Sequence, residues 1–302
     1  MVDDSLRAPE DWRTSPRGVP GVAWLLLVAA AIHVAVLWFS QSAIIQPLPI
    51  GSIVWILSGA TSFLLAAAIL VGASRWPHGR RWLVLGAACF ALRGVLDLGL
   101  DVWFAAWRPG NVPFDPAIQT VMAARGTVAA ALTVAAPLLL AAGLWTERAT
   151  GPTRRRRGVM VALALLGAVA TVGGLFEMGI ALTSSAFWDS AGQPVALIVS
   201  TQFLTALTAA AFAALSVSAM RIVRATESHT ELLITAGATA WFLTSGWMQW
   251  YEALWIPRVI EQHMPPDWIV TINLSNAVAL VGMAAMIAGF ALAGFLRRPL
   301  SD

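Results

Sequence analysis

Eight long apolar runs limit the folds open to this chain more than any other feature of its sequence. They occupy residues 21–39, 52–73, 82–106, 126–146, 158–183, 194–220, 232–255 and 268–295. A helix needs about 20 residues to cross roughly 30 Å of hydrocarbon. Because lipid cannot pair with exposed backbone groups, such runs cross it as helices. We predict an all-α polytopic membrane bundle of eight transmembrane helices over 20–299, preceded by a tail over 1–19.

The overall composition agrees with a chain whose solvent is the lipid bilayer. Of the 302 residues, 58% are hydrophobic and 12% are charged, whereas soluble domains are about a quarter charged. Soluble domains are also absent from both sides, because the segments between the runs are short. Any chemistry is therefore expected within the membrane or at its edge.

The arginines predict the orientation of the bundle. With a cytoplasmic N-terminus, 15 of the 19 arginines fall in the tail, in alternate loops or at the C-terminus, three fall on the other side, and Arg93 lies within a span. By the positive-inside rule both termini are then cytoplasmic. The distribution is typical of a multi-pass protein of the cytoplasmic membrane, such as a bacterial inner membrane. It explains the high isoelectric point without a nucleic-acid partner.

A short motif recurs in alternate runs and suggests a repeat. Residues 94–99 and 174–179 both read Gly-apolar-apolar-acid-apolar-Gly. When the four odd-numbered runs are aligned on this motif, the residues at the position of the acid are His33, Asp97, Glu177 and Gln249. Each is separated from the next by about the length of one helical hairpin. This spacing predicts four repeated hairpins. It also places four polar groups at similar depth in the outward half of the membrane.

One face of the third run is strongly polar. Arg93, Asp97 and Asp101 follow each other at intervals of four residues and so share a helix face. Arg93 and Asp97 can form an ion pair that only pins this helix to its neighbours. Alternatively, Arg93 tunes a site in which Asp97 or Asp101 binds a cation or carries a proton.

The remaining candidates come from other runs. Glu177 has no cationic partner within a turn of its own helix, so it is expected to be protonated or paired across helices. His33 is a ligand, a proton relay or an interhelical hydrogen-bonding group. Gln249 and Glu252 lie near the end of the seventh run, where Glu252 is also explained as an interfacial acid. We expect His33, Asp97 and Glu177 to share a wet recess facing outward.

Several chemistries are disfavoured by residue counts. The chain has no lysine, which excludes a retinal or pyridoxal Schiff base. Its single cysteine, Cys89, rules out an internal disulfide, and a lone histidine within a span rules out bis-histidine haem. A mixed metal site of His33 with Asp97, Asp101 and Glu177 lacks any local spacing motif. We therefore predict no cofactor.

Three functions remain open. The first is a transporter-like protein whose intramembrane pocket binds or conducts a proton, a cation or a small polar solute. The second is a membrane-embedded enzyme acting on a lipid or isoprenoid, with His33 and Glu177 as an acid–base pair. The third is a structural or assembly subunit, present as an oligomer or in a membrane complex. The lack of a catalytic motif favours the first.

Overall fold

The computed structural model describes residues 50–107, 116–147, 153–183, 195–223, 229–260 and 268–295. The predicted tail, the first predicted span and His33 lie outside these ranges. The described ranges hold helices and no strand. The elements are α2 (Ile50–Gly72), the short 3-10 helix η3 (Ala73–Arg75), α3 (Arg80–Trp107), α4 (Pro116–Thr146), α5 (Arg154–Thr183), α7 (Val195–Ile222), α8 (His229–Ile260) and α9 (Trp268–Phe295).

The described α-helices coincide with the seven predicted spans after the first. Five of them, α3, α4, α5, α7 and α9, contain stretches long and apolar enough to cross a membrane. The fold is therefore that of a multi-pass helical membrane protein, as predicted. The total of eight spans, the hairpin repeat and the side on which the termini lie remain predictions.

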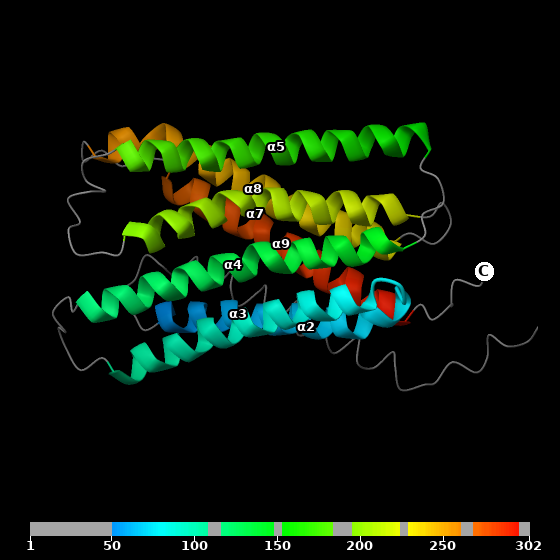
Figure 1. Ribbon diagram of the computed structural model, residues 1–302, viewed down its shortest axis with the longest axis horizontal. Helices are drawn as coiled ribbons and strands as arrows, with labels where there is room; N and C mark the ends of the chain where they lie inside the picture. Colours follow the sequence, from blue (N-terminus) through cyan, green and yellow to red (C-terminus); the bar gives the residue numbers. More distant parts are fainter. Residues whose placement is uncertain are drawn as a thin grey trace, which may run out of the picture.

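Consecutive helices run in opposite directions (Figure 1). This alternation brings many arginines to one end of the bundle, which we call the arginine-rich end; they are Arg75, Arg80, Arg81, Arg154, Arg155, Arg156, Arg157 and Arg221. It is the right-hand end in Figure 1. The positive-inside rule predicts that this end is cytoplasmic.

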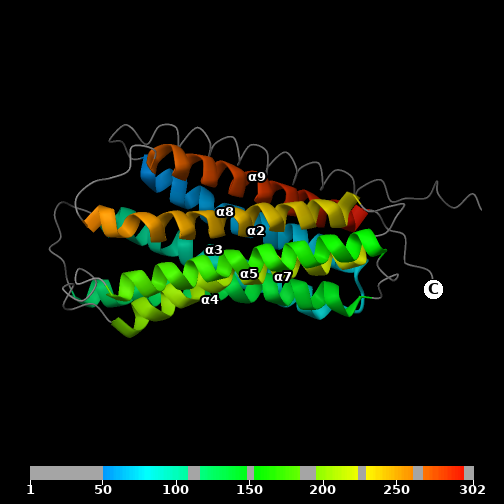
Figure 2. The same ribbon diagram turned by 90° about the horizontal axis from the view of Figure 1, so that it is seen from above.

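Six helices close into a ring. The packed neighbours are α2 with α3, α3 with α4, α4 with α7, α7 with α8, α8 with α9, and α9 with α2. Helix α5 packs on the outside of this ring against α7 and α8, and it lies along one edge of the bundle in Figure 1, with the same bundle seen from above in Figure 2. The interior of the ring is the space in which a site shielded from lipid can form.

Two helices begin at least four residues earlier than the hydropathy predicts. Helix α4 starts at Pro116 rather than at residue 126, since proline suits the first helical position, where the backbone N–H has no partner. Helix α5 starts at Arg154 rather than at residue 158, because the Thr153 hydroxyl accepts the backbone N–H of Arg156 at 3.4 Å. The prediction that these stretches are loops was wrong, because a starting proline and the arginines lower the hydropathy on which the prediction relied.

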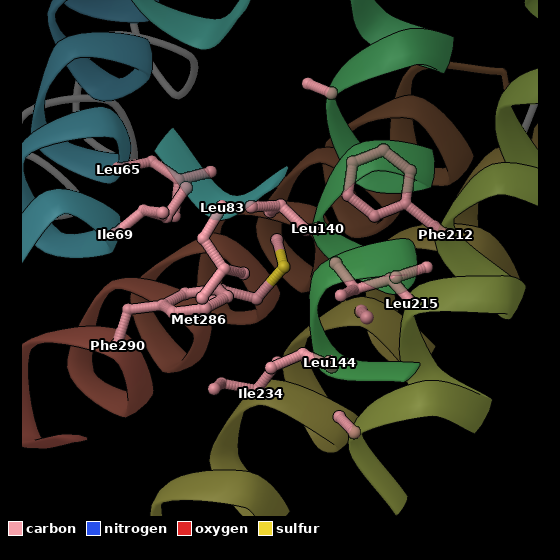
Figure 3. Packing of buried hydrophobic residues seen from close by; sticks show 14 of the residues in the cluster. Leu65, Ile69, Leu83, Leu140, Leu144, Phe212, Leu215, Ile234, Met286 and Phe290 are labelled. Atoms are coloured by element: carbon pink, nitrogen blue, oxygen red, sulfur yellow. The ribbon is translucent and has the colours of Figure 1, made fainter. Parts of the chain in front are cut away.

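The arginine-rich half of the ring is filled by apolar side chains. The largest fully buried ones include Leu65, Ile69, Leu83, Phe90, Leu140, Leu144, Phe212, Leu215, Ile234, Met286 and Phe290. Figure 3 shows how those from the different helices of the ring converge. All of them come from the halves of their helices nearer the arginine-rich end. This half of the ring is therefore closed by packing.

Buried carboxylates tie the loops together at the arginine-rich end. Glu147 accepts the Gly79 backbone N–H at 2.9 Å and so caps the start of α3. Glu231 pairs with the Nε of Arg75 at 3.2 Å and accepts the Thr230 hydroxyl at 2.6 Å. Their side chains are only 3% and 6% exposed. These acids have complete structural roles, which explains why carboxylates are tolerated there.

The two glycines of the recurring motif have different surroundings. A Cβ at Gly174 would lie 2.7 Å from the Gln249 Oε1 and 2.8 Å from the Ala206 Cα, so this glycine permits close approach of α5 to α7 and α8. Gly94 likewise meets Phe63 of α2 at 2.9 Å. A Cβ at Gly179 would meet nothing within 4 Å. Only the first glycine of the motif is therefore required by packing.

This difference predicts opposite effects of the same substitution within one helix. Gly174→Ala should lower the free energy of unfolding by about 1–3 kcal/mol, because backbone atoms must move to accept the methyl group. Gly179→Ala should be neutral or stabilising by up to about 1 kcal/mol, because alanine favours helix. Thermal unfolding in detergent, followed by circular dichroism, measures both. Equal effects would show that the Gly174 crossing is not tightly packed.

Candidate functional site

Asp97 lies between two arginines of neighbouring helices. Its Oδ1 accepts a hydrogen bond from the Nη2 of Arg125 on α4 at 3.2 Å, and its Oδ2 lies 3.5 Å from the Nε of Arg93, one turn earlier on α3. The side chains of Asp97 and Arg125 are about one-sixth exposed or less. The local ion pair predicted for Arg93 and Asp97 is therefore present, but it is part of a three-residue cluster.

The cluster carries an uneven charge. Arginine remains protonated in proteins, so Arg93, Asp97 and Arg125 together carry a net charge of about +1. Asp101 follows Asp97 by four residues on α3, but its side chain lies outside the described set. Arg125 makes a further interaction besides its pair with Asp97, so these three side chains are not the whole of the cluster.

A cavity of about 390 Å³ opens inside the ring next to this cluster. It is lined by α3, α4, α7, α8 and α9, and it contains one arginine, Arg93. Seven hydroxyl side chains complete its polar wall: Thr133, Thr201, Thr205, Thr208, Thr244, Ser245 and Ser275. Gly126, Ala129, Ala130, Ala279, Met248 and Trp241 provide the rest of the lining. Most of these residues lie at mid-helix or nearer the end opposite the arginines.

The threonine hydroxyls of the cavity wall are oriented by their own helices. Thr205 donates to the Thr201 carbonyl at 2.9 Å, Thr208 to that of Leu204 at 3.2 Å, and Thr133 to that of Ala129 at 2.7 Å. Such bonds to the preceding turn are common for threonine in helices. A hydroxyl oxygen that has donated its hydrogen retains lone pairs. The wall therefore presents mainly hydrogen-bond acceptors.

Donors in the cavity come from a few groups. The Arg93 Nε is buried, lies 3.5 Å from the Asp97 Oδ2 and has no hydrogen-bond partner among the described residues by geometric criteria. The Arg93 side chain is nevertheless 24% exposed, so part of the guanidinium reaches the cavity. The described residues also show no hydrogen bond for the Ser245 and Ser275 hydroxyls, which can donate or accept. A buried donor without a partner is unfavourable.

Glu177 and Glu252 form a second group between α5 and α8. Glu177 and Glu252 lie close enough to interact with each other, and both side chains are partly buried. Two carboxyl groups can share a hydrogen bond only when at least one of them holds a proton. Glu177 is thus paired across helices, as one branch of the prediction allowed, although its partner is another acid.

Gln249 connects three helices beside this acid pair. Its amide nitrogen donates to the Thr205 carbonyl of α7 at 3.0 Å, and its side chain lies against Gly174 of α5. The residue is 96% buried, and its Oε1 has no partner among the described residues. The contacts therefore give Gln249 a packing role in this group.

The predicted site residues thus fall into two groups. Arg93 and Asp97 belong to the arginine cluster beside the cavity, whereas Glu177, Glu252 and Gln249 meet between α5, α7 and α8. Only Arg93 among them lines the cavity. A recess shared by His33, Asp97 and Glu177 stays a prediction because His33 lies outside the described residues. Within the described ranges, no three His, Cys, Asp or Glu side chains gather as metal ligands would.

Sequence reasoning missed Arg125 and the hydroxyl wall. Arg125 looked like a residue of the outer loop, but the Asp115-Pro116 pair, a typical N-cap and first helical residue, would have shown that α4 begins before it. The hydroxyls had a weaker signal. Thr201, Thr205 and Thr208 recur at helical spacing on α7, yet threonine also serves simply for close packing in membrane helices.

Comparison with known proteins does not assign the chain to a family. No protein family, no curated protein and no solved structure matches this chain.

The charge pattern predicts unequal losses within the cluster. Asp97→Asn leaves two arginines without their shared carboxylate, so it should lower the free energy of unfolding by about 3 kcal/mol or more. Arg125→Gln keeps the Arg93–Asp97 pair and should cost about 1–2 kcal/mol. Arg154→Gln, at an exposed position at the start of α5, is the control. The free energy of unfolding of each variant is measured in mixed micelles. If Asp97→Asn lowered it no more than the control does, Asp97 would not be the shared partner of the two arginines.

Proposed function

We propose that this multi-pass membrane protein binds a small polar solute in the hydroxyl-lined cavity and provides its route across the membrane. The observation that carries the proposal is the cavity itself, a polar space inside a ring of apolar helices. Ligand pockets are commonly a few hundred cubic ångströms in volume and carry a small number of convergent polar groups. This cavity supports the transporter-like prediction.

The contrast between the two halves of the ring supports this function. Apolar side chains close the arginine-rich half (Figure 3), whereas the cavity occupies the middle and the opposite half. If the arginine-rich end is cytoplasmic, the solute site faces outward and the packed half is the inner barrier. Alternating access requires such a closed half on one side of the site.

The other two functions have less support from the geometry. An enzyme needs an acid–base pair at its substrate, but the described lining contains no histidine or carboxylate. A purely structural subunit has no need of a polar cavity, because apolar filling of the ring is more stable. Within the transporter reading, the presence of Arg93 in a lining without a described carboxylate favours a polar solute over a cation.

Filling the cavity tests this proposal. Ala130→Phe places a ring in the cavity, and Ala164→Phe adds the same group on the exposed face of α5. Flux into proteoliposomes is followed by light scattering for glycerol, lactamide, lactate and choline. We expect at least one solute to enter about tenfold faster than in protein-free vesicles. Ala130→Phe should abolish this increase because it occupies the route, and Ala164→Phe should not.

The opposite result would identify the cavity as a packing gap. In that case no solute would cross faster than in empty vesicles, and Ala130→Phe would raise the Tm by filling empty space. The structural role would then be the better explanation.

The Glu177–Glu252 pair favours a proton pathway as a second candidate. Glutamine at position 177 can still donate a hydrogen bond to Glu252, but it cannot release a proton. Glu177→Gln should therefore keep the Tm within a few degrees and reduce proton influx severalfold. Influx is driven by a valinomycin potassium gradient and read with an internal pH dye. Equal influx in wild type, variant and empty vesicles would leave the pair only a packing role.

A further inference from the structure

A second pocket, of about 590 Å³, lies at the arginine-rich end of the bundle, where α3 begins (Figure 1). None of its lining residues lines the solute cavity. Apart from Pro77, the lining side chains are exposed ones that differ in character along the chain: His78, Arg80 and Arg81 are basic, whereas Val84 and Leu85 are apolar. The pocket is therefore open to the surroundings of the bundle, and one part of it is basic while the other is apolar.

Both arginines of this pocket lack a carboxylate partner. In the part of the chain that the structure describes, no ion pair involves Arg80 or Arg81. The Arg81 guanidinium lies 5.2 Å from the centre of the Trp82 ring, a contact that leaves its N–H donors available. Arg75 at the same end is different, because it pairs with Glu231. The pocket therefore offers two guanidinium groups to a ligand.

The acid that contacts this loop is already engaged. Glu147 accepts the Gly79 backbone N–H at 2.9 Å, and its other oxygen lies 3.3 Å from the Nδ1 of His78. Its side chain is only 3% exposed, so it holds the loop from the inner side and does not line the pocket. The described lining thus contains basic groups and no carboxylate.

The position of the pocket matches the boundary between lipid headgroups and hydrocarbon. The apolar span of α3 begins at Arg80. Val84 follows four residues later, which is about 6 Å deeper along a helix. Arginines at the end of a span lie at the level of the headgroups, and exposed apolar side chains one turn further contact acyl chains. The pocket therefore suits a ligand with an anionic end and an apolar end.

We propose that this pocket binds an anionic glycerophospholipid, whose phosphate pairs with Arg80 and Arg81 and whose acyl chain begins against Val84 and Leu85. Planar guanidinium groups suit phosphate oxygens, with which they form two parallel hydrogen bonds. A headgroup that also carries an ammonium group is less favoured, because that group would lie near two arginines. Basic pockets at the cytoplasmic ends of spans commonly bind such headgroups. This site is independent of the solute cavity.

Competition between two lipids tests the site. Delipidated full-length protein in detergent receives equal amounts of phosphatidylglycerol and phosphatidylcholine, and native mass spectrometry counts the bound molecules. We expect phosphatidylglycerol to bind about tenfold more tightly. Combined Arg80→Gln and Arg81→Gln should abolish most of this preference. Combined Arg154→Gln and Arg155→Gln is the matched control, because it removes the same charge from exposed positions at the start of α5, and it should retain the preference.

Two further variants separate the pocket from its charge. Leu85→Trp keeps both arginines but fills the apolar part of the pocket, so it should weaken binding of phosphatidylglycerol severalfold. Combined Arg80→Lys and Arg81→Lys keeps the charge and should retain part of the preference, since lysine binds phosphate as a point charge. Added phosphatidylglycerol should raise the Tm of the wild type and not that of the double glutamine variant. All three positions are exposed, so the variants should fold.

Three results would overturn the lipid site. One is an equal loss of preference in the double glutamine variant and in the α5 control, which would assign the preference to surface charge alone. Another is unchanged binding in Leu85→Trp, which would place the lipid elsewhere, and this result decides the matter even if the double glutamine variant does not fold. The last is that glycerol 3-phosphate binds as tightly as phosphatidylglycerol, which would make the ligand a free anion.

Discussion

Helices in lipid gain nothing by hiding apolar side chains from their surroundings, and this constraint governs the whole bundle. Association must come from contacts that lipid cannot supply. Here those contacts are close helix crossings at glycines such as Gly174 and Gly237, where a Cβ would meet backbone atoms of another helix. Ion pairs across helices, such as Arg125 with Asp97, add a second kind. Both kinds require a specific rotation of each helix, so they determine which faces line the ring.

The same constraint explains how the bundle contains both a tight core and a cavity. Where large apolar side chains fill the ring, near the arginine-rich end, the helices need no further partner. Farther along, small residues and threonines replace them, and the ring is left with space and polar groups. The threonines tolerate this position because their hydroxyls bond to the preceding turn. A change in side-chain size along the helices therefore produces the asymmetry that a solute site requires.

The acids of this chain show that similar motifs lead to different roles. Asp97 and Glu177 share a sequence frame, yet Asp97 has two arginines as neighbours while Glu177 has another glutamate. The difference comes from the adjacent helix. Helix α4 presents Arg125 to α3, and α8 presents Glu252 to α5, and neither pairing is local in sequence. Glu147 and Glu231, by contrast, have purely structural partners at the arginine-rich end.

The sequence by itself determined the helices, their alternation and the membrane as solvent, because each depends on hydropathy, length and charge within a local window. It also predicted the Arg93–Asp97 pair, since both residues lie on one turn of one helix. Only the tertiary structure decided that Arg125 joins this cluster, that Glu252 lies near Glu177, and that threonines of α4, α7 and α8 line one cavity. These relations depend on helix rotation and on which helices are neighbours. Both are set by packing between residues distant in sequence, and hydropathy carries no information about them.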